Sequence, residues 1–115
     1  MDNTVKEKSF RFSVRIVKLC RFLRETKKEF VMSKQLLRCG TSIGANVTEA
    51  QMAQSHADFC AKMYIALKEA NETQYWIRLL HKTGYITDPE YESIKNDIDE
   101  IVRLLVAITK SAKGK

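Results

Sequence analysis

The sequence has few helix-breaking residues and no long apolar run. It holds one Pro and four Gly in 115 residues, far below the content of a loop-rich or disordered chain. No apolar run approaches the ~20 residues that span a bilayer. The first ten residues, MDNTVKEKSF, lack the apolar segment of a secretory signal. With 44% hydrophobic and 30% charged residues, the chain is expected to be one globular domain in the cytoplasm, with no membrane partner.

Motifs for catalysis and metal binding are also missing. The sequence contains no GxxxxGK(S/T), GxGxxG, GxSxG or HExxH, and no Glu-x-x-His pair of the di-iron bundles. Cys20, Cys39 and Cys60 lack CxxC spacing, so we expect structural thiols rather than a zinc site. His56 and His81 lie near expected helix ends, where capping and the helix dipole account for them. The sequence therefore predicts a protein that is not an enzyme and holds no metal or cofactor.

What the sequence does contain is four stretches with helical periodicity. Apolar residues recur at spacings of three and four over residues 4–28, 34–53, 56–83 and 89–111. No stretch shows the alternation of a strand with turn signals at both ends. Helices of this length joined by short loops predict an all-α fold, an antiparallel up-down-up-down four-helix bundle that occupies residues 1–115 as a single domain.

Residues at the expected helix boundaries support this division. Ser33 is expected to cap the second helix and Ser55 the third. Gly84 is expected to end the third helix in the left-handed conformation. Thr87 and Glu90 have the spacing of a capping box at the start of the fourth helix.

Positive charge is concentrated at the start of the chain. Residues 1–38 hold eleven Lys and Arg against four Asp and Glu, whereas residues 39–82 are balanced and residues 83–115 carry a charge of −1. A concentrated basic surface attracts polyanions, so nucleic acid or an acidic protein face is the expected partner. The alternative is a solvated face that only keeps the protein soluble.

Within the first helix, four of these cations fall in one row with spacings of three, four and three. Four like charges in a row repel one another unless an anion meets them. We therefore predict a nucleic-acid-binding face made of this row and the cations that flank it. Its members are Lys8, Arg11, Arg15, Lys18, Arg21, Arg24, Lys27, Lys28 and Lys34.

The first and fourth helices carry more apolar residues than one bundle core requires. Phe10, Val14 and Val17 form a second strip beside the core stripe of the first helix, and Val102 and Val106 extend that of the fourth. Spare apolar surface usually meets a partner. A homo-oligomer is therefore expected.

The second helix combines two glycines with a polar row. Gly40 and Gly44 predict that another backbone approaches closely, since glycine inside a helix costs about 1 kcal/mol against alanine. For the polar row, one hypothesis is a network in which Arg38 and Asn46 cross to acidic residues of the third helix, and the other is a solvated face. Such a network would fix the helix register rather than perform chemistry. Its members would be Arg38, Ser42, Asn46, Glu49, Glu69 and Glu72.

Residues 37–50, LRCGTSIGANVTEA, resemble the small bacterial proteins known as the 23S rRNA intervening-sequence protein family. Residues 58–76 and the turn Gly84-Tyr85-Ile86 are similar to the family's third helix and to its turn into the fourth. The one departure noticed is Ala50, where a glycine often follows the glutamate of the pattern.

The resemblance implies a four-helix bundle that forms a ring-shaped homopentamer and has no established biochemical activity. It also implies a likeness to accessory proteins of diversity-generating retroelements, which bind nucleic acid and a reverse transcriptase through basic surfaces. Two hypotheses follow. The first is a non-catalytic homo-oligomer that binds nucleic acid, with RNA favoured over DNA. The second is a protein-interaction scaffold whose basic face docks an acidic or polymerase-type partner.

Overall fold

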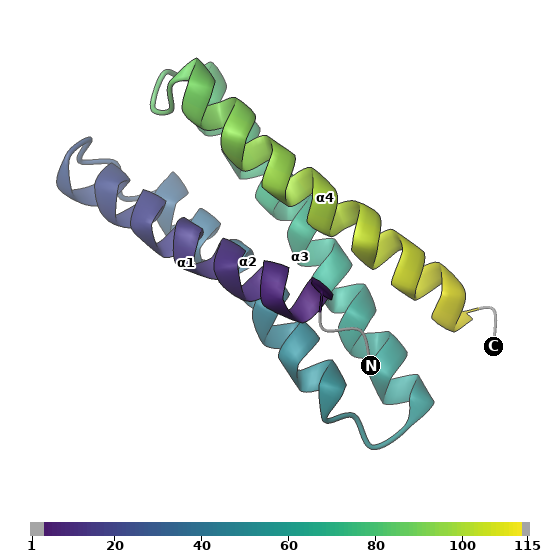
Figure 1. Cartoon of the computed structure of the whole chain (residues 1–115). Coiled ribbons are helices and arrows are strands. Elements are labelled where there is room, and N and C mark those ends of the chain that lie inside the picture. Colours follow the sequence, from purple (N-terminus) through teal and green to yellow (C-terminus); the bar gives the residue numbers. More distant parts are fainter. Residues whose placement is uncertain (1–3, 114–115) are drawn as a thin grey trace.

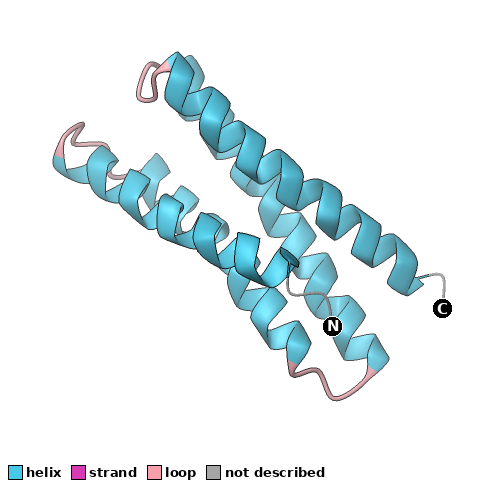
Figure 2. Cartoon of the chain, in the orientation of Figure 1, coloured by secondary structure: helices cyan, strands magenta, loops and turns pink. Residues whose placement is uncertain are grey.

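The computed structural model describes residues 4–113. In that range the chain forms four helices and no strand: α1 (Thr4–Glu25), α2 (Met32–Gln51), α3 (His56–Lys82) and α4 (Asp88–Lys113). Successive helices run in opposite directions, so the α1–α2 and α3–α4 connections lie at one end and the α2–α3 connection at the other (Figure 1). All three connections are short (Figure 2). The all-α four-helix bundle expected from the sequence is confirmed.

The apolar stripes of the four helices meet in one core along the bundle axis, which is 46 Å long. Each helix packs on the next in the chain, and the contact between α1 and α4 is the least extensive. Burial of these stripes, at roughly 25 cal/mol per Å² of apolar surface, is the main favourable contribution to folding. The core includes Phe12, Ile16, Leu23, Leu36, Ile43, Val47, Met63, Ala70, Ile77, Leu80, Ile94, Ile98, Ile101 and Leu105.

The two glycines of α2 let α1 approach closely. A Cβ atom at Gly44 would lie 3.2 Å from the carbonyl oxygen of Ser9, and one at Gly40 would lie 2.9 Å from side-chain carbons of Ile16. The expected close approach of a second backbone is therefore confirmed. The backbone belongs to α1, however, so the glycines do not serve the polar contacts between α2 and α3.

The α1–α2 connection differs from the expectation. Helix α1 ends at Glu25 rather than near residue 28, because the chain turns through Lys28 in the left-handed conformation, with φ of 55°. Ser33 does not cap α2 but lies inside it, and its hydroxyl donates to the carbonyl oxygen of Glu29 over 2.8 Å. The Glu29 carboxylate performs the capping, since it accepts the backbone N–H groups of Val31, Met32 and Ser33 over 2.7–3.1 Å.

The other boundaries carry the expected caps. The Ser55 hydroxyl accepts the backbone N–H of Asp58 over 3.1 Å at the start of α3. Gly84 follows α3 with φ of 87°. The backbone N–H groups of Thr87 and Glu90 each donate to the other's side-chain oxygen over 3.4 Å. None of the helices described is long and apolar enough to cross a bilayer.

The cysteines are free thiols. Cys20 and Cys39 are buried in the bundle and Cys60 is half-buried. Burial raises the pKa of Cys20 to about 12 and also raises the pKa of Cys39. Both buried thiols are therefore protonated at neutral pH and pack as small apolar groups, as the sequence predicts.

Candidate nucleic-acid interface

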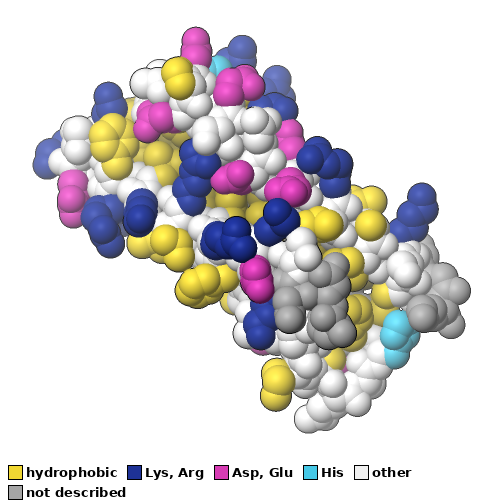
Figure 3. Space-filling model, in the orientation of Figure 1, with side chains coloured by type: hydrophobic (Ala, Val, Ile, Leu, Met, Phe, Trp, Pro, Cys, Tyr) yellow, Lys and Arg dark blue, Asp and Glu magenta, His cyan; other side chains and the backbone are white. Residues whose placement is uncertain are grey.

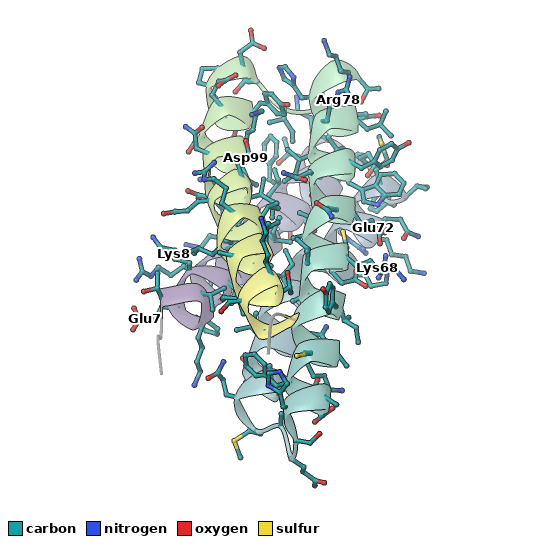
Figure 4. All side chains as sticks on the ribbon, turned by 90° about the vertical axis from the view of Figure 1, so that its right-hand side faces the viewer. Glu7, Lys8, Lys68, Glu72, Arg78 and Asp99 are labelled. Atoms are coloured by element: carbon teal, nitrogen blue, oxygen red, sulfur yellow. The ribbon has the colours of Figure 1, made fainter. Side chains whose placement is uncertain are left out.

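The basic row of α1 faces carboxylates on α4. Lys8 Nζ lies 3.2 Å from Glu100 Oε2, and Arg15 Nη1 lies 2.8 Å from Asp97 Oδ2. Lys8 projects beside α4 in Figure 4. Because Asp97 and Glu100 are three residues apart in a helix, they share a face and meet two members of the row.

The other two members of the row have different surroundings. Arg11 is paired on its own helix, with Nη2 3.2 Å from Glu7 Oε2. Lys18 is exposed and forms no ion pair with any carboxylate in residues 4–113. Three of the four cations in the row therefore form ion pairs with carboxylates of the same chain, which offsets the repulsion expected from the sequence.

Lys18 and the five remaining candidate cations gather at the end of the bundle that carries the α1–α2 connection. All six are exposed, and none forms an ion pair within the described part of the chain. Lys and Arg side chains cluster over this end in Figure 3. We call this surface the basic end, and its members are Lys18, Arg21, Arg24, Lys27, Lys28 and Lys34.

Two aromatic rings lie among these cations. Lys27 Nζ lies 5.9 Å from the centroid of the Phe22 ring, and Arg24 Cζ lies 5.6 Å from that of Phe30. The Phe22 side chain is 37% exposed and that of Phe30 is 51% exposed. Basic side chains interleaved with exposed rings offer a strand of nucleic acid both phosphate contacts and stacking surfaces. In the sequence, the signal for this arrangement is that Phe22 and Phe30 lie within a segment rich in Lys and Arg, residues 21–30.

Glu29 holds the loop that presents the basic end. Its burial would raise the pKa of this carboxyl group, but the hydrogen bonds from the backbone N–H groups of Met32, Ser33 and Val31 outweigh that effect and lower it. Glu29 is therefore ionised at neutral pH, and its charge is directed at the N-terminus of α2, where the helix dipole favours an anion. This use of Glu29 keeps its charge away from the exposed cations of the loop, none of which forms an ion pair within residues 4–113.

The polar network joins α2 to α3 through one arginine. Arg38 Nη1 lies 3.1 Å from Glu69 Oε1, and the same guanidinium pairs with Glu72. The hydrogen bond from Arg38 lowers the pKa of Glu72, and the indole N–H of Trp76 also donates to that carboxylate over 3.2 Å. Glu72 projects from the side of α3 that also bears Lys68, away from α4 (Figure 4).

The other expected members do not take part in this network. The Ser42 hydroxyl donates to the Arg38 carbonyl oxygen over 2.6 Å, and the Asn46 amide donates to the Ser42 carbonyl oxygen over 2.8 Å. Asn46 therefore does not cross to α3, because a carbonyl four residues back on its own helix satisfies its amide. Glu49 instead pairs with Lys62 of α3 over 3.2 Å.

The histidines connect helix ends. His56 Nε2 lies 3.0 Å from the carbonyl oxygen of Ala112, which joins the start of α3 to the end of α4. His81 Nε2 lies 2.7 Å from Asp88 Oδ1 across the α3–α4 turn. Cys60 Sγ lies 3.5 Å from His56 Nε2. Within residues 4–113, no group of three His, Cys, Asp or Glu side chains is placed to hold a metal ion.

Comparison with known proteins places this bundle in a family. Residues 1–107 match the family described as 23S rRNA-intervening sequence protein. The chain belongs to this family. The likeness seen in residues 37–50 is thus confirmed.

A solved structure agrees with this membership. A protein from Bacteroides thetaiotaomicron VPI-5482, described as one of unknown function from the S23 ribosomal protein family, is similar at 63% sequence identity. The match covers 95% of this chain and 97% of that chain, with a TM-score of 0.93. A search of curated proteins finds no match. The 23S rRNA-intervening sequence family thus provides a fold and an association with rRNA, but neither description names a reaction or a ligand.

Proposed function

We propose that this member of the family is a non-catalytic homo-oligomer that binds nucleic acid, and RNA in particular, through the basic end. The observation that carries the proposal is the contrast between two groups of cations. Lys8 and Arg15 already have carboxylate partners on α4, whereas the six cations of the basic end are exposed and have no carboxylate partner among residues 4–113. The family's association with rRNA favours RNA over DNA.

The physics of such a surface is that of phosphate binding. Each phosphate neutralised by Lys or Arg releases counter-ions, so the affinity falls steeply with salt, with a logarithmic slope of about −0.7 per phosphate for single strands. Phosphate contacts carry little sequence information. We therefore expect binding that depends strongly on salt and weakly on sequence.

Exposed apolar side chains support the oligomeric part of the proposal. Phe10, Val14 and Val17 line one strip of α1, and the Phe10 side chain is 68% exposed. Val106 of α4 is also exposed. Further copies that covered these strips would repeat the basic end once per copy on one particle, and weak contacts would then add by avidity. The family resemblance favours a pentamer.

The environments of the histidines support a non-catalytic role. His56 and His81 contact backbone and side-chain groups at helix ends, where they link neighbouring segments. The three free thiols support a cytoplasmic location, since cysteines stay reduced there.

The second candidate is a scaffold whose basic end docks an acidic protein. Phe30 and Val31 favour it, because both apolar side chains are exposed at the tip of the α1–α2 connection. Exposed apolar residues rimmed by charge are typical of protein-binding surfaces. This scaffold would not require binding to arbitrary oligonucleotides.

The test is a binding titration of nuclease-treated protein with labelled RNA across a salt series. The test variant combines Arg21→Glu with Lys28→Glu. The matched control, Arg78→Glu with Lys110→Glu, makes the same change in net charge at exposed cations of α3 and α4. We expect the first variant to lose most of its affinity and the control to lose much less, with the oligomer intact by light scattering. Equal losses, or no binding at low salt by the folded wild type, would contradict the proposal, and the latter result would favour the scaffold.

A further inference from the structure

A groove separates α1 from α4 at the basic end. Its volume is about 300 Å³, the lower limit of the roughly 300–1,000 Å³ of small-molecule sites. The groove lies between α1 and α4, the pair of helices with the least extensive contact in the bundle. Figure 3 shows hydrophobic surface between the loop ends of α1 and α4, with Lys and Arg side chains along the α1 side.

The lining of the groove is apolar within and cationic at one rim. Leu19, Ile86 and Ile94 contribute aliphatic surface, and Phe22 contributes a partly exposed aromatic ring. Lys18 lines the groove without a carboxylate partner in residues 4–113. A slot with an aromatic ring and an adjacent free cation fits a flat, apolar-faced group that is attached to an anion.

The carboxylate of Glu90 makes the two sides of the groove differ in charge, since Lys18 of α1 is cationic and Glu90 of α4 is anionic. One of its oxygens, Oε1, accepts the capping hydrogen bonds of Thr87, and a carboxylate has further acceptor capacity on its second oxygen. Glu90 therefore offers an acceptor to N–H donors and repels an anion. An anionic group is thereby directed to the Lys18 rim, and an N–H-bearing edge is directed toward α4.

We propose that this groove binds one unpaired nucleobase of a single-stranded RNA. The base stacks on Phe22 and presents its N–H edge to Glu90, while the adjoining phosphate meets Lys18. This inference rests on the proposed function and adds the substrate class, namely single-stranded RNA rather than duplex. A duplex offers the same phosphates, but its bases are paired and stacked, so none can enter the groove.

Phe22 is the residue to change, because it is partly exposed and is not part of the buried core. Phe22→Ala removes the stacking surface, whereas Phe22→Trp keeps an aromatic ring there. Tyr64→Ala is the matched control, since it removes an aromatic side chain of similar exposure from α3, outside the groove. The probes are a short single-stranded RNA, a strand of equal length with an abasic ribose-phosphate backbone, and a duplex RNA.

Loss of one base–aromatic stack predicts that Phe22→Ala weakens binding of the base-bearing strand by roughly five- to 150-fold. Binding of the abasic strand should change less than twofold, Phe22→Trp should restore the affinity, and Tyr64→Ala should leave all three probes unaffected. Melting curves establish that each variant is folded.

The other outcomes separate this inference from the proposed function. If Phe22→Ala weakens the base-bearing and abasic strands equally, or weakens neither, the inference is wrong while phosphate binding stands. The inference is also wrong if an acidic peptide displaces the RNA and its own binding depends on Phe22, since the groove would then be a protein-docking site. If the wild type binds none of the three probes at low salt, the proposed function fails and the inference fails with it.

Discussion

Arg15 of α1 and Asp97 of α4 join the first and last helices, with Nη1 2.8 Å from Oδ2. Together with Lys8 and Glu100, they bridge the least extensive helix contact of the bundle. Both ion pairs are substantially exposed, so each contributes at most about 1 kcal/mol to stability. Their larger effect is to neutralise cations that an external polyanion would otherwise meet.

Release of these cations should therefore strengthen RNA binding. In the double variant Asp97→Asn with Glu100→Gln, Lys8 and Arg15 lose their carboxylate partners and the α1 row becomes more positive. We expect tighter binding at low salt and a steeper decrease of affinity with salt, because more phosphates are neutralised. Titrations at several salt concentrations measure this effect. Unchanged affinity and salt dependence would mean that bound RNA does not reach the row.

The second prediction concerns Glu29, the carboxylate that caps α2. Replacement by Gln removes the charge from the helix N-terminus and weakens three hydrogen bonds, so we expect a loss of about 1–2 kcal/mol in the free energy of unfolding at neutral pH. Urea denaturation measures the loss. Lys34→Gln, an exposed change one turn further along, is the control and should have little effect.

The contribution of Glu29 should disappear in acid. The fold lowers its pKa, so below the ordinary glutamate pKa of about 4.3 the unfolded chain binds the proton more readily than the folded chain. The stabilisation is therefore fully present above that pH and is lost as the pH falls through the folded-state pKa. Denaturation curves of the wild type and Glu29→Gln should converge toward low pH. A constant difference between them would argue against a charge effect.

The third prediction concerns Arg38, which pairs with Glu69 and Glu72 of α3. In Arg38→Met the two carboxylates lose their shared counter-charge, and Glu69 is largely buried. We expect a loss of about 1 kcal/mol, because Arg38 itself is half exposed and solvent screens part of the interaction. Thermal melts at low and high salt measure it, with a smaller difference at high salt. An unchanged melting temperature would remove the network as a contributor to stability.

The fourth prediction separates the three thiols. Burial raises the pKa values of Cys20 and Cys39, so neither offers a thiolate at neutral pH, and both are shielded by the core. A thiol reagent should modify only Cys60 in the native protein and all three cysteines after denaturation. Mass spectrometry counts the modified sites. Rapid native modification of Cys20 would show that the contact between α1 and α2 opens readily.

Local signals in the sequence account for most of the fold. The caps at Ser55, Gly84 and Thr87 were identifiable because a cap depends on residues within one helical turn. The Glu29 cap was missed for a physical reason. Its carboxylate reaches α2 only after the chain turns through a left-handed Lys28, and nothing in that residue type indicates such a turn.

In the candidate site, too, some features depend on residues close in sequence and others depend on how the helices pack. The sequence by itself determined the four helices and their inward faces, because the spacing of apolar residues is a property of neighbouring residues. It also determined that positive charge is concentrated in residues 1–38, because that depends only on the local density of Lys and Arg. The carboxylates of α4 decide which cations of the α1 row are paired with another helix and which are not. One of them, Asp97, is 82 residues from Arg15 along the chain. Only the tertiary structure brought those carboxylates to the α1 row. Ion pairing falls off with distance in space rather than in sequence, and packing alone sets that distance.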